Sequence, residues 1–496
     1  MYINNKILVG KSEKIEANLL LTHANRHGLI TGASGTGKTI TLKVLAESFS
    51  DAGVPVFFSD VKGDLAGCCL PGEESDSLKE RLNNLKIDNF EYKSYPVTFW
   101  DLYAKEGIPI RTTVSSIGPN ILSIMLGLSE VQEGVLDIVF KIAEDEDIKL
   151  DDLKDLKSIL QYIGDNRKDY ITKYGNITTQ SIGVIQRSLL SLQNQGVDKF
   201  FGFPELDIKD FITTNNEGRG MINILHAVEL FKNPDLYAAF MLWFLTELFN
   251  KMPEVGDLDK PKIVFFFDEA HLLFNEIPSY RLKQITQVVK LIRSRAIGLY
   301  FFSQKPTDIP DSLIGQLGNR VQHALRAYTP AELKIVKTAA EAFRVNPSFD
   351  TEKEITNLGT GEALVSFQNE NGEPEIVQKV TILPPQSKMG IIDEMTRTKI
   401  INNSILINKY TFEAGERESA YEEITKRNEE KQKQIDEEKF AKEEAKRLKE
   451  EEKAKRQAER EKKNNPIYKT GRRVASRVEG RLITKAINAI FKALKK

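Results

Sequence analysis

The sequence has few cysteines and no long hydrophobic run, and both absences exclude whole classes of protein. Its 496 residues include two cysteines, Cys68 and Cys69, which are adjacent. Neighbouring cysteines rarely form a disulfide and two thiolates do not complete a zinc site, so a disulfide scaffold and a cysteine-based metal centre are excluded. No run reaches the ~18 apolar residues that a membrane-spanning helix needs. The first ten residues lack the layout of a secretory signal, so we expect a cytoplasmic protein of two or three domains.

An excess of charge of one sign is also missing, because 70 Lys and Arg residues face 71 Asp and Glu residues. The total of −1 hides a segregation along the chain. Residues 464–496 sum to +8, residues 413–463 to −1 and residues 1–412 to −8. A mildly acidic body therefore precedes a mixed charged segment and a strongly basic end, and the overall charge predicts little about partners.

A glycine-rich segment is the strongest signal in the sequence. Residues 27–31 form a short apolar run that predicts a strand, and residues 40–49 have apolar positions at helical spacing. Between them, Gly32-Ala-Ser-Gly-Thr-Gly-Lys-Thr39 matches the phosphate-binding P-loop, or Walker A, pattern in full. A second buried strand at 54–58 completes a β-α-β unit.

The P-loop residues predict how a nucleoside triphosphate is held. Glycines let the backbone curl until successive N–H groups point at phosphate oxygens. Lys38 then reaches the β and γ phosphates, and the Thr39 hydroxyl binds Mg²⁺. We therefore expect ATP and Mg²⁺ as ligands. The predicted nucleotide-binding residues of this segment are Gly32, Ala33, Ser34, Gly35, Thr36, Gly37, Lys38, Thr39 and Ile40.

Hydrolysis also needs an acid near Mg²⁺ and a base for the attacking water, and a single strand end supplies both. Residues 263–267 are five apolar residues that predict a buried strand, and Asp268 and Glu269 follow directly. We predict that Asp268 holds Mg²⁺ and that Glu269 polarises the water, which is the Walker B arrangement.

Three further residues are candidates for roles in catalysis. Gln304 ends the next predicted strand, at 297–303, where it could sense the γ phosphate. Arg293 and Arg295 are candidates for a transition-state arginine that one subunit supplies to its neighbour.

The remaining pattern predicts an α/β core with a mainly parallel sheet, a helical insertion and a charged C-terminal helix. Further strands are expected at 320–325 and in a hairpin of 361–367 with 376–382. The predicted parts are an ATPase core at 1–115 and 252–390, a mainly helical insertion at 116–251, a charged helical stalk at 391–463 and a basic amphipathic tail at 464–496.

Five motifs together resemble a known family. They are the run Asn25-Arg26-His27-Gly28 that leads into the P-loop, Gly53-Val-Pro-Val, Asp60-Val-Lys-Gly-Asp64, Phe-Asp268-Glu-Ala-His271 and Ser303-Gln-Lys-Pro306. The combination strongly resembles the HerA/FtsK-type P-loop ATPases and, within them, the bacterial YjgR-like subfamily of HerA-like proteins. The resemblance covers about residues 1–390.

The resemblance implies a RecA-like core that assembles as a hexameric ring, with the nucleotide between subunits and DNA in the central channel. It implies that Arg295 is the arginine finger and that Arg26 lies near the nucleotide. Asp60 and Asp64 match an acidic motif of the family whose role stays open.

Two functional alternatives to a DNA translocase or helicase remain open. The tail repeats apolar residues every four positions between Arg and Lys residues, a pattern typical of a basic amphipathic helix. Such a helix could direct the ATPase to a protein partner or an anionic membrane surface. A nucleotide-dependent switch with weak turnover is the third interpretation.

Overall fold

The computed structural model describes residues 1–274, 279–411, 418–464, 481 and 485. These residues divide into two compact units, Met1–Tyr421 and Glu422–Lys496. The basic tail predicted at 464–496 lies outside the described residues, apart from Asn464, Arg481 and Lys485.

One mixed sheet forms the centre of the first unit and, within the described residues, contains thirteen strands. The strands are β1 (Tyr2–Ile3), β2 (Lys6–Lys11), β3 (Glu16–Leu20), β4 (Gly28–Thr31), β5 (Val56–Asp60), β6 (Val97–Asp101), β7 (Ile108–Pro109), β8 (Ile222–His226), β9 (Ile263–Phe267), β10 (Ile297–Ser303), β11 (Asn319–Gln322), β12 (Glu362–Ser366) and β13 (Gln378–Ile382).

The central strands run parallel in the order β11-β4-β10-β9-β5-β8-β6-β7. Antiparallel pairing then extends the sheet from β11 through β12, β13 and β2, which pairs with both β1 and β3. The expected α/β fold with a mainly parallel sheet is confirmed. The expected hairpin of 361–367 with 376–382 corresponds to β12 and β13.

The helices are α1 (Lys38–Asp51), α2 (Asp76–Leu85), α3 (Val114–Met125), α4 (Glu130–Asp145), α5 (Leu153–Asp165), α6 (Arg167–Tyr174), α7 (Thr179–Asn194), α8 (Pro234–Lys251), α9 (Ser279–Ile292), α10 (Asp311–Ile314), α11 (Pro330–Glu341), α12 (Thr351–Asn357), α13 (Glu394–Asn403), α14 (Ile405–Thr411) and α15 (Ala420–Asn464). None of those described combines the length and apolar character that crossing a bilayer demands.

Helices cover both faces of the parallel strands, which explains why β9 is apolar at every position. Phe266 of β9 packs on Phe49 of α1, with ring centroids 6.2 Å apart. Its neighbour Phe265 packs on Phe244 of α8, at 5.5 Å. Successive side chains of a strand point to opposite faces, so a strand covered on both sides needs apolar residues throughout.

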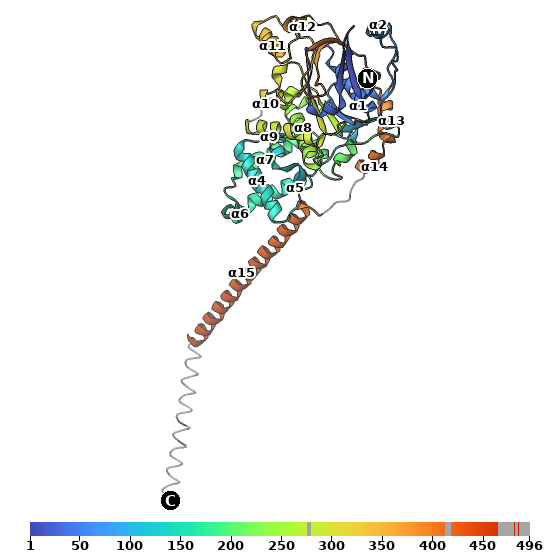
Figure 1. Ribbon diagram of the computed structural model, residues 1–496. Helices are drawn as coiled ribbons and strands as arrows, with labels where there is room; N and C mark the ends of the chain where they lie inside the picture. The colour runs from blue at the N-terminus through green and yellow to red at the C-terminus, as the bar shows by residue number, and fades with distance from the viewer. Residues whose placement is uncertain (275–278, 412–417, 465–480, 482–484, 486–496) are drawn as a thin grey trace. The chain divides into compact units, whose positions relative to one another are not determined.

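The range 116–251, predicted as a mainly helical insertion, contains helices and also one strand of the sheet. Helices α4 to α7 gather beside the sheet (Figure 1), with α4 and α5 packed on α7. Strand β8, however, pairs in parallel with β5 and β6. The prediction missed this strand because its sequence, Ile-Asn-Ile-Leu-His, is short and contains two polar residues, so it shows neither a continuous apolar run nor a distinctive period.

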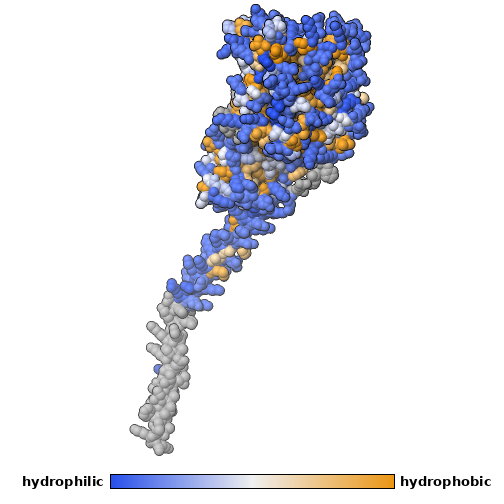
Figure 2. All heavy atoms as spheres, viewed as in Figure 1, coloured by the Kyte–Doolittle hydropathy of each residue, from blue (hydrophilic) through white to orange (hydrophobic). Residues whose placement is uncertain are grey.

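The range 391–463, predicted as a charged stalk, begins in the first unit. Helix α13 contacts β6 and α14 contacts β7. Tyr410 of α14 is fully buried, and its ring lies 5.6 Å from that of Trp100. The second unit begins at Glu422. Its helix α15 is hydrophilic along most of its length (Figure 2) and carries ion pairs four residues apart, such as Glu438 with Lys442.

Candidate functional site

The P-loop connects the carboxyl end of β4 to the first turn of α1, as predicted. Gly37 has a φ of 122°, a conformation that side chains other than hydrogen rarely allow. Gly32 approaches its neighbour closely, since a Cβ there would lie 2.5 Å from His323 Cβ. Both positions therefore require glycine. The resulting loop has the close backbone curvature that a phosphate group needs.

Lys38 folds back onto the loop that it follows. Its Nζ donates hydrogen bonds to the carbonyl oxygens of Gly32, at 2.6 Å, and Ala33, at 3.2 Å. Burial lowers the pKa of Lys38, whereas the negative charges of Glu269 and Asp268 raise it. These electrostatic effects place the lysine and both acids in one site, although 230 residues separate Lys38 from Asp268 in the sequence.

His323 packs against the P-loop and the first turn of α1, and the sequence did not predict this contact. Its Nδ1 lies 3.0 Å from the Glu362 carbonyl oxygen and must donate there, so Nε2 accepts from the Thr41 hydroxyl at 2.8 Å. Burial lowers the pKa of His323 to about 4, and the Lys38 charge acts in the same direction. The ring is therefore neutral at pH 7. No local pattern indicated this contact, because His323 follows β11, whose residues Asn319–Gln322 are mostly polar.

Asp268 and Glu269 directly follow the carboxyl end of β9. Asp268 Oδ1 accepts the Glu269 N–H at 2.9 Å, and burial raises the pKa of Asp268 to about 6, with the charge of Glu269 as a second cause. Glu269 has left-handed backbone angles, φ 47° and ψ 47°. Its Oε2 is buried and takes part in no hydrogen bond among the described residues, although it lies 3.4 Å from His271 Nδ1. A carboxylate oxygen without a hydrogen bond is able to accept a proton from water.

A buried hydroxyl chain fixes the backbone at Asp268. Tyr237 of α8 donates to the Asp268 carbonyl oxygen at 3.2 Å, and its hydroxyl lies 2.7 Å from Ser59 Oγ on β5. Tyr237 is fully buried. These hydrogen bonds join β5 to the end of its neighbour β9, at the carboxyl ends of the parallel strands, where the P-loop also lies.

Gln304 follows β10, the strand that separates β4 from β9. Ser303 of β10 is in register with Thr31 of β4, and Phe301 with Phe267 of β9. Gln304 therefore leaves the sheet between the P-loop and Asp268, and its side chain is exposed. This is the position that a sensor of the γ phosphate requires.

Three arginines lie near the amino ends of the parallel strands, whereas the P-loop follows a carboxyl end. They are Arg26, Arg293 and Arg295. Arg26 precedes β4, and the other two precede β10, which runs parallel to it. Arg295 donates to the Met252 carbonyl oxygen and lies 4.3 Å from the Phe249 ring centroid. The Nε atoms of Arg26 and Arg295 are buried and have no hydrogen-bond partner among the described residues. Arg26 and the P-loop thus lie at opposite ends of β4 within this chain, and the place of Arg26 near the nucleotide stays a prediction.

Asp60 shapes the turn after β5, and the structure gives this acidic motif a local role. Its carboxylate accepts the Gly63 N–H at 2.8 Å and the Leu65 N–H at 3.1 Å. Burial, together with the charge of Asp64, raises the pKa of Asp60 to about 6. The turn brings Lys62 close enough that its charge lowers the pKa of Asp268.

The fold and this site together define a P-loop ATPase. The chain belongs to the HerA-like helicase family, because the family model described as "Helicase HerA-like C-terminal" matches residues 5–495. The family inferred from the motifs is confirmed.

Individual relatives are distant in sequence. The chain is 21% identical over 370 residues to the DNA double-strand break repair helicase HerA of Sulfolobus acidocaldarius, covering 72% of this chain and 66% of the relative. The HerA of Saccharolobus solfataricus is 21% identical over 365 residues, covering 72% and 64%. This chain thus spans slightly less than two thirds of the length of these relatives.

Two solved structures are similar to this chain. The conjugative coupling protein TrwB has 12% identity and a TM-score of 0.49, covering 79% of this chain and 95% of its own. VirB4 of Thermoanaerobacter pseudethanolicus has 14% identity and a TM-score of 0.49, covering 77% and 97%.

Proposed function

We propose that this protein is a Mg²⁺-dependent ATP hydrolase that works as an oligomeric DNA translocase or helicase. The observation that carries the proposal is the meeting of Lys38, Asp268 and Glu269 at one edge of the sheet, around a loop whose Gly32 and Gly37 leave room for phosphate. The relatives named as DNA repair helicases support DNA as the substrate.

The ligands fit the residues present. Backbone N–H groups of residues 32–39 and the Lys38 ammonium bind the phosphates, and Lys38 exchanges its bonds to the Gly32 and Ala33 carbonyls for phosphate oxygens. The Thr39 hydroxyl and the Asp268 carboxylate are hard oxygen donors of the kind that Mg²⁺ prefers. When bound, Mg²⁺ neutralises charge on the phosphate oxygens.

Glu269 is the general base. Its Oε2, which takes part in no hydrogen bond among the described residues, accepts a proton from the attacking water as the water oxygen approaches the γ phosphorus. Gln304 extends from the strand between the two motifs and contacts the γ phosphate or the water.

The arginines support an oligomer. Arg26 and Arg295 lie near the amino ends of β4 and β10, away from the P-loop of their own chain. We propose that their guanidinium groups reach the nucleotide of a neighbouring subunit, in the hexameric ring that the family resemblance implies. Arg295 then acts as the arginine finger, stabilising charge that develops in the transition state.

Two substitutions test the function. Glu269→Gln should lower the ATP turnover of the full chain by about 10²-fold or more while MgATP binding is kept, because it removes the base and little else. Lys38→Ala should weaken ATP binding itself. Phosphate release and isothermal calorimetry measure the two effects, with and without duplex DNA.

The matched control is Glu80→Gln, an exposed glutamate on α2. Wild-type turnover in Glu269→Gln would contradict the assignment of the base. Turnover and binding that ignore DNA at every salt concentration would contradict the motor.

A further inference from the structure

The turn after β5 contains a lysine, Lys62, that has no role in the mechanism described above. Strand β5 pairs in parallel with β9, and Phe58 is in register with Phe266. Two residues further along each chain stand Asp60 and Asp268. Lys62 follows Asp60 by two residues, so it leaves the sheet next to Asp268, at the carboxyl ends of the parallel strands. Ligands of parallel α/β sheets bind at this end of the strands.

The charge of Lys62 acts on both halves of the phosphate site. Burial is the main cause that raises the pKa of Asp268, and the charge of Lys62 opposes it. Burial also lowers the pKa of Lys38, and the charge of Lys62 adds to this effect. The ammonium group of Lys62 thus lies near the P-loop lysine and near the proposed Mg²⁺ ligand. The γ phosphate is the group that both of these residues approach in a P-loop site.

The turn leaves Lys62 as its exposed side chain. Val61 and Leu65, on either side of it, are 7% and 1% exposed, and Gly63 is buried with a φ of 78°. Lys62 is exposed and takes part in no hydrogen bond or ion pair within the described residues, not even with nearby Asp64. Its charge is therefore not neutralised by a partner in the fold and can bind an anion.

The backbone on either side of Lys62 is fixed by buried hydrogen bonds. Asp60, which is 1% exposed, accepts the N–H groups of Gly63 and Leu65 through its carboxylate. Its carbonyl oxygen accepts the Ala227 N–H at 3.0 Å, at the end of β8. The turn is thus held from inside and from the neighbouring strand, so Lys62 projects from a defined position.

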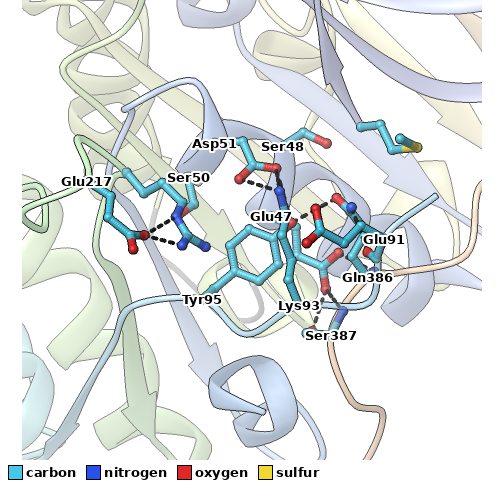
Figure 3. A network of polar contacts seen from close by, with 12 residues as sticks. Glu47, Ser48, Ser50, Asp51, Glu91, Lys93, Tyr95, Glu217, Gln386 and Ser387 are labelled. Carbon is cyan, nitrogen blue, oxygen red and sulfur yellow. Dashed lines mark hydrogen bonds and ion pairs between the residues drawn. The ribbon is translucent and has the colours of Figure 1, made fainter. Parts of the chain in front are cut away.

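Further hydrogen bonds tie this region to the helix that begins at the P-loop. Gly67, just after the turn, donates its N–H to the Gly390 carbonyl oxygen at 3.1 Å. Glu47 of α1 accepts the N–H groups of Gln386, at 2.7 Å, and Ser387, at 3.2 Å (Figure 3). The segment 386–390 therefore joins the Lys62 turn to α1, and the turn keeps a fixed spacing from the P-loop.

We propose that Lys62 binds the γ phosphate of the nucleotide held by its own chain and stabilises negative charge there during hydrolysis, an inference that rests on the proposed function. As the water oxygen bonds to the γ phosphorus, the bond from phosphorus to the β–γ bridging oxygen breaks and its electron pair leaves with ADP. Glu269 takes the water proton. Lys62 donates N–H hydrogen bonds to the γ oxygens and keeps its own protons.

A pair of ligands that differ by the γ phosphate isolates this contact. One is MgADP, and the other is the Mg²⁺ complex of the ATP analogue with an imido group in place of the β–γ bridging oxygen. In the full chain, Lys62→Met should weaken binding of the analogue by about tenfold or more, because it removes a charge-assisted hydrogen bond. MgADP binding should stay within about twofold of the wild type. Isothermal calorimetry measures each dissociation constant.

Two further variants control for charge and for position. Lys62→Arg keeps the cation and should retain most of the affinity for the analogue. Lys168→Met removes an exposed lysine of α6 and should leave both affinities unchanged. The turnover of ATP, followed by phosphate release, should fall by about tenfold or more in Lys62→Met and stay at the wild-type level in Lys168→Met.

The outcomes distinguish the inference from the function on which it rests. If Lys62→Met binds the analogue as the wild type does, or loses the analogue and MgADP equally, Lys62 does not contact the γ phosphate. Lys38→Ala is the reference, because it should weaken both ligands. Should Lys38→Ala bind both normally, the proposed function fails. A normal response to Lys38→Ala without the expected effect of Lys62→Met overturns the inference alone.

Discussion

At the scale of single residues, burial fixes the protonation of the histidines beside the P-loop strand. His27 Nε2 lies 2.8 Å from the Val289 carbonyl oxygen and donates to it, while Nδ1 accepts the Leu299 N–H at 3.1 Å. A second proton would place two N–H groups against each other. Burial lowers the pKa of His27 to about 4, and the Arg293 charge lowers it further. His323 titrates in the same range.

This burial predicts an acid-sensitive fold. In the unfolded chain His27 binds a proton near pH 6.5, whereas in the folded protein it stays neutral down to about pH 4. Acid therefore favours the unfolded state, and His27 alone should lower the free energy of unfolding by about 2 kcal/mol between pH 7 and pH 5.

His27→Asn keeps an acceptor for the Leu299 N–H but cannot titrate. The decrease in unfolding free energy between pH 7 and pH 5 should therefore be smaller in this variant than in the wild type by about 2 kcal/mol. Urea unfolding at both pH values measures it. The same pH dependence in variant and wild type would contradict the assignment.

At the scale of elements, α1 is buried on faces that carry charged residues. Lys43 and Glu47 stand four positions apart, a spacing typical of an exposed ion pair on a helix surface. Their side chains are instead 0% and 2% exposed and bond the segment 386–388. Burial raises the pKa of Glu47, and the Lys43 charge lowers it. In Figure 3, Tyr95 links the same region to Asp51, at the end of α1.

Removing one member of this buried set should be costly. Glu47→Ala leaves two backbone N–H groups and the Lys43 charge uncompensated, so we expect a loss of about 3–5 kcal/mol in unfolding free energy. The double variant Lys43→Met/Glu47→Leu removes both charges and should recover a large part of it. Denaturant unfolding measures both, with exposed Glu80→Ala as control. A loss below about 1 kcal/mol in Glu47→Ala would contradict the role of these bonds.

At the scale of the whole molecule, the predicted site residues lie at the two opposite ends of the parallel strands. The P-loop, Asp268 and Gln304 follow the carboxyl ends of their strands, and Arg26 and Arg295 precede the amino ends. Parallel strands keep these groups apart within one chain. In the oligomer that we propose, a second chain presents its arginines to the P-loop of the first.

Mixing inactive subunits tests this plan. Lys38→Ala and Arg295→Ala should each abolish ATP turnover alone. In an equal mixture, about a quarter of randomly formed interfaces join an intact Lys38 to an intact Arg295 and should recover activity. Arg293→Ala, an exposed arginine of the same edge, is the control and should stay active. A mixture no more active than its components would contradict a site shared between subunits.

The sequence alone determined the features that depend on local spacing. These features are the strand, glycine loop and helix around residues 32–39, the apolar run that ends at Asp268, and the individual motifs of the family. Each of them is a run of consecutive residues. Their geometry follows from backbone conformation and from the alternation of a strand buried on both faces. The same reasoning missed β8, whose five residues have no distinctive period.

Only the tertiary structure decided which distant residues meet. The pairing of β11 with β4 brings His323 next to the P-loop. Folding also buries Lys43 and Glu47 against a segment more than 300 residues away. Such contacts depend on which strands pair and which faces are covered, and local periodicity carries no information about either.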